Sequence, residues 1–473
     1  MLGRHGRAFT SACAAASLAV AACGSPQATS PAPASGGAAA PAAAPAAAGQ
    51  AAAPANPNAT VIRYALWDSG QQPAYEQCAA KFQGLNPNIQ IKFEQVGWDD
   101  YWSSLQTGFV SGNAPDVFTD HLAKYPEFAA KGQIVDIQPL VEKDKVDTKA
   151  YIGQLPDLWV RDGKRYGLPK DWDTVAVVYN KDMFTKAGVD PAIMKTWTWN
   201  PKDGGTFQQT LAKLSLDKNG NNGESPNFDK NNVTQYGYIH QGAGGGVGQT
   251  QWSMFAASDG FKFIDNVWGT KYYYDDPKLA ESVQWYADLA NKKGFAPPLA
   301  DVTSLGGLQV FASGKGALTI DGSWTIGDYT TKSTFPVGFG LLPTGPSGRK
   351  SMFNGLADSI WTGSKHQDEA WKWVSFAASQ ACEDIVGSTG VVFPALKSGA
   401  DKSLAAHSAK GADVSPYTDE ALDPNGTFLF PITDHASEIT AIMTPTLESI
   451  MLGQTDAASA LKDANSKVNA LFK

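Results

Sequence analysis

Apolar and polar positions first form a regular pattern near residue 60 of this 473-residue chain. The pattern predicts, in order, a strand, a helix, a strand, a helix and a strand over residues 61–67, 75–82, 89–96, 101–110 and 114–118. The first strand is almost wholly apolar, the next strand alternates with a period of two, and the first helix repeats at i, i+3, i+4 and i+7. This order is typical of the α/β class, with a largely parallel sheet and helices on both faces.

The pattern continues through the second half of the chain. A hairpin-like turn is expected at 161–166, a new strand at 175–180, and helices at 277–292, 366–379 and 457–472. The ordered part of the chain is therefore expected to run from residue 60 to the last of these helices.

The residues before 60 differ in composition. Arg4 and Arg7 precede an apolar run, 8–19, that is too short to span a bilayer, and this arrangement is typical of a secretory signal. The residues after 23 are almost all Ala, Pro, Gly, Ser and Gln, which cannot bury enough apolar surface to fold. We expect a signal peptide over 1–22 and an extended, disordered tether over 23–59.

Cys23 lies in the stretch VAACGS, which resembles the lipobox of bacterial lipoproteins. The resemblance implies that Cys23 is acylated, with chains such as palmitate, and becomes the mature N-terminus. More than one acyl chain holds a protein at a membrane, whereas a single chain binds only marginally. The alternative is an ordinary signal peptide with a chance cysteine.

Composition and motifs narrow the class of function. The formal charge is −8 and Lys and Arg form no run, so the basic footprint of a nucleic-acid-binding protein is missing. No later segment has the apolar length of a membrane span. The sequence has no G-x-S-x-G or H-E-x-x-H motif, and its six His lack metal-ligand spacing. We expect no metal site, no cofactor and no nucleic-acid partner.

The polar stretch 217–224 (DKNGNNGE) has part of the composition of a calcium loop. The Gly of the sixth position is replaced by Asn222, and Phe228 stands where a Glu is needed at the twelfth. We therefore expect a surface turn.

Two cysteines remain once Cys13 is removed with the signal and Cys23 is acylated. Cys78 and Cys382 are far apart in the sequence. In an oxidising compartment they form either a single disulfide or two buried free thiols, and both alternatives stay open.

Several short motifs together resemble one family over nearly the whole ordered chain. In sequence order they are 64–68 (YALWD), 113–117 (NAPDV), 166–169 (YGLP) with 177–184 (VVYNKDMF), 315–324 (KGALTIDGSW), 354–356 (NGL) and 364–371 (SKHQDEAW). Each motif alone is weak, but their common order behind a lipobox is specific. The chain resembles the family 1 extracellular solute-binding proteins of carbohydrate ABC importers, the group that includes maltose-binding protein.

The resemblance implies a two-lobed, type II periplasmic-binding-protein-like fold, with discontinuous lobes joined by a hinge. The first lobe would comprise 60–169 and 354–398, and the second 170–353 and 399–473. The function implied is capture of a sugar or oligosaccharide between the lobes and its delivery to the transmembrane permease subunits of an ABC transporter. We expect a monomer that is anchored by its lipid on the outer face of the cell membrane.

A sugar presents hydroxyl groups to polar side chains and C–H faces to flat aromatic rings. The chain has 14 Trp, several of them at predicted strand ends. Trp324 also resembles a stacking position of the family. The candidate ligand contacts are aromatic, acidic and amide residues at predicted strand ends, loops and crossings, namely Trp67, Asp68, Gln95, Trp98, Asp120, Asp171, Trp172, Asp173, Trp252, Trp324, Asn354, Gly355 and Asp358.

Two other functions remain open. A tethered glycoside hydrolase would need paired carboxyl groups, and Asp68, Asp120 and Asp171 are candidates for such a pair. However, no acid lies in an apolar setting that would clearly raise its pKa. The other alternative is a non-sugar solute, such as glycerol phosphate, a polyamine or a peptide. Phosphate would favour Arg or Lys at the site, whereas the candidates here are acidic, amide and aromatic.

Overall fold

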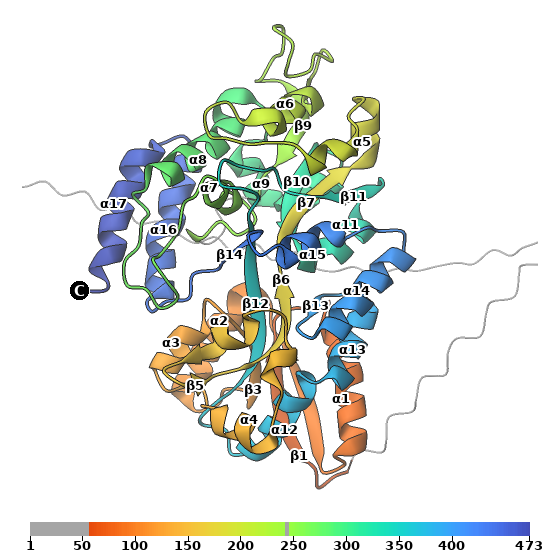
Figure 1. Ribbon diagram of the computed structural model, residues 1–473, viewed down its shortest axis with the longest axis vertical. Helices are drawn as coiled ribbons and strands as arrows, with labels where there is room; N and C mark the ends of the chain where they lie inside the picture. Colours follow the sequence, from red (N-terminus) through yellow and green to blue (C-terminus); the bar gives the residue numbers. More distant parts are fainter. Residues whose placement is uncertain (1–55, 242–245) are drawn as a thin grey trace, which may run out of the picture. The chain divides into compact units, whose positions relative to one another are not determined.

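The computed structural model describes residues 56–241 and 246–473 (Figure 1). The predicted signal peptide, Cys23 and almost all of the predicted tether lie outside these residues. None of the helices within the described ranges is long and apolar enough to cross a membrane.

A mixed sheet organises the first half of the fold. Its strands are joined in the order β13–β6–β12–β3–β1–β2, and β14 also pairs with β12. Their bounds are β1 (Thr60–Leu66), β2 (Ile89–Gln95), β3 (Val117–His121), β6 (Leu168–Asp173), β12 (Ser351–Ile360), β13 (Phe393–Pro394) and β14 (Thr427–Leu429). β1 is parallel to β2 and β3, whereas β12 is antiparallel to β3 and β6.

Helices pack around this sheet and bury a first core. They are α1 (Gln72–Leu85), α2 (Trp98–Ser111), α3 (Tyr125–Ala130), α4 (Gln138–Asp144), α12 (Gln367–Ala377), α13 (Gln380–Thr389) and α14 (Lys397–Ala409). The short hairpin β4 (Val160–Arg161) and β5 (Lys164–Arg165) follows the last residues of a 3₁₀ turn. In the first core, Trp373 of α12 contacts Tyr64 of β1 and Phe82 of α1 edge to face. Such apolar contacts hold the helices on the sheet.

A second mixed sheet organises the other half, in the order β11–β7–β10–β9–β8. Its strands are β7 (Val175–Asn180), β8 (Leu216–Asp217), β9 (Val233–Ile239), β10 (Gly316–Gly322) and β11 (Val337–Gly340). β10 is parallel to β9 and antiparallel to β7. The helices of this half are α5 (Lys181–Lys186), α6 (Gly205–Leu214), α7 (Ser253–Ser258), α8 (Pro277–Asp288), α9 (Leu299–Leu305), α10 (Gly307–Ala312), α11 (Ile326–Lys332), α15 (Ser415–Leu422), α16 (Ala436–Met451) and α17 (Ala457–Ala470). Leu279, Leu447 and Leu461 join α8, α16 and α17 in a second core.

The elements expected from the sequence pattern are largely confirmed. The predicted strands at 61–67 and 89–96 are β1 and β2, and the predicted helices at 75–82 and 101–110 lie within α1 and α2. The α/β class is also confirmed. The prediction of a largely parallel sheet holds for β1 with β2 and β3 and for β9 with β10, but it is wrong for β12, which is antiparallel to β3 and β6, and for β7, which pairs antiparallel on both sides.

The chain passes between the two sheets at β6 and β12. β6 ends at Asp173, and β7 of the second sheet begins two residues later at Val175. The backbone N–H of Val175 donates to the Ser351 hydroxyl at the start of β12, 2.9 Å away. α14 packs against α13. The lobe limits that the sequence predicts, including the one at residue 398, stay predictions.

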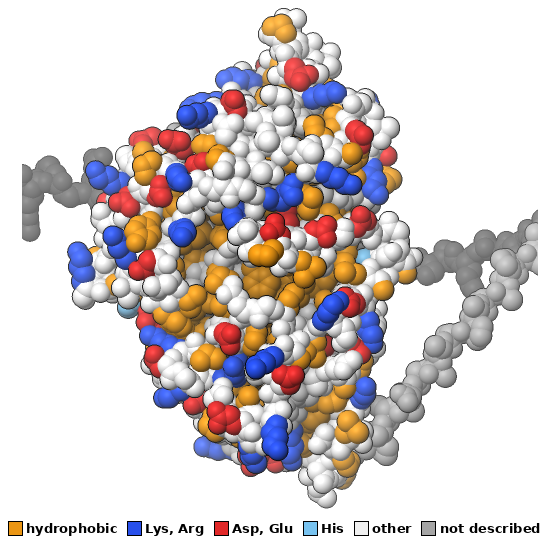
Figure 2. Space-filling view, viewed as in Figure 1, with side chains coloured by type: hydrophobic (Ala, Val, Ile, Leu, Met, Phe, Trp, Pro, Cys, Tyr) orange, Lys and Arg blue, Asp and Glu red, His pale blue; other side chains and the backbone are white. Residues whose placement is uncertain are grey.

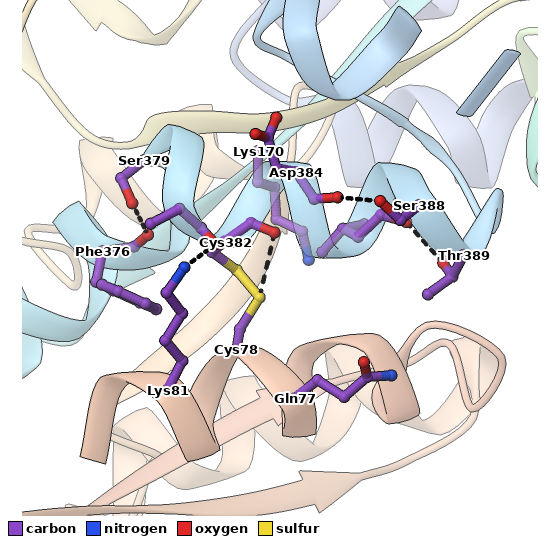
Figure 3. Close-up of a disulfide and its surroundings, with 12 residues drawn as sticks. Gln77, Cys78, Lys81, Lys170, Phe376, Ser379, Cys382, Asp384, Ser388 and Thr389 are labelled. Carbon is purple, nitrogen blue, oxygen red and sulfur yellow. Dashed lines mark hydrogen bonds between the residues drawn. A yellow bond between two sulfur atoms is a disulfide. The ribbon is translucent and has the colours of Figure 1, made fainter. Parts of the chain in front are cut away.

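Cys78 of α1 and Cys382 of α13 form a disulfide, with their Cα atoms 5.1 Å apart (Figure 3). Both residues are fully buried. Of the two alternatives left by the sequence, the structure shows the disulfide. It closes a loop across a sequence separation of 304 residues and ties the first helix of the fold to α13.

The stretch that resembles a calcium loop is organised by Asp217. Its carboxylate accepts hydrogen bonds from the backbone N–H groups of Asn219, Asn221 and Asp229 and from the Asn221 side chain. Burial opposes ionisation of Asp217, but these hydrogen bonds lower its pKa to about 2. The carboxylate therefore holds this turn together.

Candidate functional site

A cavity of about 590 Å³ is lined by residues of both sheets and both cores. Trp67, Asp68 and Asp171 belong to the first sheet or its strand ends, whereas Ser323 and Trp324 follow β10 of the second sheet. Figure 2 shows hydrophobic side chains gathered across the middle of the visible face, between zones rich in charged side chains.

Trp67 and Trp98 form one aromatic wall of the cavity. Their rings meet edge to face with centroids 5.1 Å apart, and Trp67 also packs on Tyr101 and Trp102 of α2. Trp98 is 43% exposed, which is unusual for so large an apolar side chain. These contacts fix the two indoles while leaving part of their surface open to the cavity.

Trp324 supplies an aromatic surface from the second sheet. Its ring lies over the backbone of Gly322, where an added Cβ would be only 2.0 Å from the ring. Glycine at 322 is therefore required by the close approach of this indole. Trp324 is half-buried, and its position at the end of β10 places it on the cavity.

Asp68 and Asp173 are cavity carboxyl groups that already have hydrogen-bond donors. Asp68 accepts from the backbone N–H of Gly70 and from the Gln71 amide. Asp173 accepts from the amides of Gln249 and Asn354, at 2.8 and 2.9 Å. Burial raises the pKa of Asp173 to about 8 despite these bonds.

Asp171 is a buried cavity carboxyl group without such support at one of its two oxygens. It is 2% exposed, and its Oδ2 has no hydrogen-bond donor among the described residues. Burial raises its pKa to about 7, against the attraction of Lys170. This result contradicts the sequence expectation that no acid lies in a setting that raises its pKa.

The basic residues of the cavity are His121 and Lys124. Burial lowers the pKa of His121 to about 3, so this imidazole is neutral near pH 7. Burial also lowers the pKa of Lys124, whose ammonium lies 5.4 Å from the Trp102 ring centroid. The charged groups of the cavity are consequently mostly acidic.

Eight of the sequence candidates line the cavity, namely Trp67, Asp68, Trp98, Asp171, Trp172, Asp173, Trp324 and Asn354. Trp172 lies mainly in the first core, where its ring stacks between Phe353 and Phe393. Its indole N–H donates a hydrogen bond to the Pro394 carbonyl. The roles of all eight in binding remain predictions.

Asp120 and Asp358 do not line the cavity. Asp120 of β3 is fully buried and bonds to the Ser359 hydroxyl, and Asp358 of β12 accepts from the hydroxyls of Tyr64 and Thr119. Because Asp120 pairs with Ala357 and Asp358 pairs with Thr119, the two carboxyl groups lie on opposite faces of the first sheet, and both are buried within the first half of the fold.

Gln95, Trp252 and Gly355 also lie outside the lining. Gln95 is exposed and donates to the Trp67 carbonyl. Trp252 is fully buried in the second core, and the Cβ position of Gly355 is filled by Leu155. The sequence missed other lining residues, which are Gln249, Tyr272, Tyr274, Phe430, Thr433 and Ile439 among others.

Two α/β halves, with a cavity lined by indoles and carboxyl groups drawn from both, define a two-lobed solute-binding protein. Comparison with known families agrees with this class. The model of the family described as "Bacterial extracellular solute-binding protein" matches residues 67–381, and the chain belongs to this family.

Individual relatives share only about a quarter of their residues with this chain. The chain is 26% identical over 372 residues to the diacetylchitobiose binding protein DasA of Streptomyces coelicolor, covering 75% of this chain and 79% of that protein. It is similar to the crystal structure of UspC of M. tuberculosis, with a TM-score of 0.70, 27% identity and coverage of 87% and 100%. The Listeria monocytogenes ABC substrate-binding protein Lmo0181, solved with cycloalternan, shares the fold with a TM-score of 0.75, 23% identity and coverage of 87% and 99%.

Proposed function

We propose that this chain captures a sugar or oligosaccharide outside the cytoplasm and delivers it to the permease of an ABC transporter. The observation that carries the proposal is the cavity, in which Trp67 and Trp98 face the ligand space from the first half and Trp324 from the second. Indole rings supply flat surfaces for the C–H faces of a sugar, and Asp68, Asp171 and Asp173 supply acceptors for its hydroxyl groups. Membership of the solute-binding family supports delivery to a transporter.

Thermal shift and calorimetry over a panel of mono- and oligosaccharides test this proposal. A ligand that binds only the folded protein raises the melting temperature in proportion to the logarithm of its excess over Kd. We expect at least one saccharide to raise it. A rise with glycerol phosphate, polyamines or peptides, and with no saccharide, would instead support the non-sugar alternative.

We further propose that the chain binds its ligand without cleaving it. The family supports this proposal. The raised pKa of Asp171, about 7, lies in the range of a general acid, so hydrolysis is the activity to test directly. Chromogenic glycosides should release no phenol above the uncatalysed rate. Release that disappears in Asp171→Asn would favour the tethered hydrolase.

We also propose that Cys23 carries the acyl anchor and that residues 24–59 act as the tether to a monomeric binding domain. The proposal rests on the lipobox resemblance and the Ala- and Pro-rich composition. Expression with an alkyne-bearing palmitate analogue should label the wild-type protein in the membrane fraction. The Cys23→Ala variant should lose the label, and labelling that persists in it would contradict the anchor.

A further inference from the structure

Asp171 occupies a special place on β6. The pairing of β6 with β12 shifts there, because Leu356 pairs with Asp171 and Ala357 with Pro169, which leaves Lys170 as an extra residue. Such a bulge re-aims the side chains around it. Asp171 lines the cavity while remaining 2% exposed, and its Oδ2 lacks a donor among the described residues.

Lys170, the neighbouring cation, is engaged elsewhere. Its ammonium donates to Thr119, lies 4.0 Å from the Asp358 carboxylate and 4.0 Å from the centroid of the Tyr75 ring. Lys170 and Asp358 are both nearly fully buried, so the ammonium balances the charge of Asp358. Lys170 attracts Asp171 only through space, while Asp358 and Asp68 repel it.

The formal charges around the cavity leave Asp171 without a counter-ion. Asp68, Asp99, Asp171 and Asp173 line it, against the single ammonium of Lys124 within the described lining. Asp68 and Asp173 each have donors from the protein, but Asp171 has none at Oδ2. An ionised carboxylate in this position is costly unless a partner arrives.

We propose that this partner is an ammonium group of the ligand, and that the cavity selects saccharides bearing a free amine at the position that meets Asp171. The inference rests on the proposed function and refines it. A neutral hydroxyl supplies one donor, whereas an ammonium supplies up to three donors together with the missing positive charge. An adjacent cation would lower the pKa of Asp171 from about 7, so binding of an amine near pH 7 would release a proton from Asp171.

Calorimetry with matched sugars tests the inference. Each set contains a sugar with a free amine, its hydroxyl analogue and its N-acetyl analogue, for example glucosamine, glucose and N-acetylglucosamine. Matching sets are built on galactose, on mannose and on the β-1,4-linked dimers of the three glucose-based sugars. Because an ammonium adds a positive charge and further donors beside the buried carboxylate, the amine of at least one set should bind about tenfold tighter or more than its hydroxyl analogue.

Two variants distinguish a specific role of Asp171 from a general loss of negative charge. Asp171→Asn keeps the shape of the side chain and should reduce the preference for the amine over its hydroxyl analogue to less than about threefold, measured as a ratio of affinities within each set. Asp100→Asn removes an exposed carboxylate of α2 that is outside the lining, and it should keep the full preference. Melting temperatures of both variants check the fold.

Each outcome decides the inference. Wild-type protein that binds hydroxyl or N-acetyl sugars as tightly as their amines overturns it and leaves the proposed function standing. An amine preference that persists in Asp171→Asn overturns the role of this residue. Failure of every saccharide to bind would overturn the proposed function itself.

Discussion

Arg161 holds Asp434 through two parallel hydrogen bonds, from Nη1 to Oδ1 at 2.7 Å and from Nη2 to Oδ2 at 2.8 Å. The guanidinium also lies 4.3 Å from the ring centroid of Trp268. Arg161 belongs to the β4–β5 hairpin of the first half, whereas Asp434 lies two residues before the start of α16 of the second. Because Ala436 and Ile439 of α16 line the cavity, this pair connects the two halves beside the ligand space.

Removing this connection should favour an open arrangement of the halves. Both side chains are about a third exposed, so we expect Arg161→Ala to weaken ligand binding by about 1 kcal/mol, or roughly fivefold. Small-angle X-ray scattering should show a larger radius of gyration for the unliganded variant. Asp162→Asn is the matched control, because Asp162 is 89% exposed and 3.8 Å from Arg161. Unchanged affinity and radius in Arg161→Ala would show that the pair does not hold the halves together.

Trp324 should contribute stacking energy to the ligand. Trp324→Ala is expected to weaken binding by about 1–3 kcal/mol with little change in the melting temperature of the free protein, because the ring is only half-buried. Gly322→Ala should weaken binding as well, since its Cβ would collide with the indole. Titration calorimetry measures both. Trp361→Ala, which removes an indole outside the cavity lining, is the control, and equal affinities for Trp324→Ala and wild type would refute the stacking role.

The sequence predicted the part of the site that depends on local order along the chain. Trp67 and Asp68 directly follow an apolar strand, and a strand end is where α/β proteins place ligand contacts. Trp324 likewise follows a buried strand. The pattern of apolar positions was enough to locate these ends.

The remaining parts depend on tertiary pairing that no local pattern contains. Asp120 and Asp358 lie on strands as well, but both are buried between β3 and β12, where their carboxyl groups bond to side chains of the first half. Phe430 and Ile439 reach the cavity because β14 pairs with β12 at Ser351–Phe353, a contact between segments far apart in the sequence. The periodicity of apolar positions predicts which face of a strand or helix is buried, but it does not predict which other strand or helix packs against that face.

The disulfide between Cys78 and Cys382 should stabilise the fold. It restricts the unfolded chain over a long loop, and we expect the Cys78→Ala/Cys382→Ala variant to lose about 2–5 kcal/mol in the free energy of unfolding. Guanidinium titration with and without a reductant measures this. Wild-type protein with a reductant should behave like the double variant, whose own midpoint should not respond to the reductant. Quantitative alkylation of both thiols in oxidised, denatured protein would contradict the bond.

Asp120 should make stability depend on pH. Burial raises its pKa to about 8, aided by repulsion from Asp358 and opposed by the His121 N–H, the Ser359 hydroxyl and Lys124. The folded protein therefore keeps the Asp120 proton up to about pH 8, while the unfolded chain loses it near pH 4. The unfolded state gains from ionisation across this range, so the contribution of Asp120 to stability falls as the pH rises from about 4 to about 8.

Asp120→Asn isolates this effect from every other titrating group. Protonated Asp120 can donate to the Ser359 hydroxyl, which in turn donates to the Tyr166 carbonyl, and an amide can replace the acid in this chain. The stability difference between Asp120→Asn and wild type should therefore shift in favour of the variant between pH 4 and pH 8, by at most about 1.4 kcal/mol per pH unit. Denaturant titrations at several pH values measure the difference, with Asp100→Asn as the surface-carboxylate control. A difference that stays constant over this range would mean that Asp120 is ionised in the folded protein, with its charge compensated by Lys124 and the surrounding hydrogen bonds.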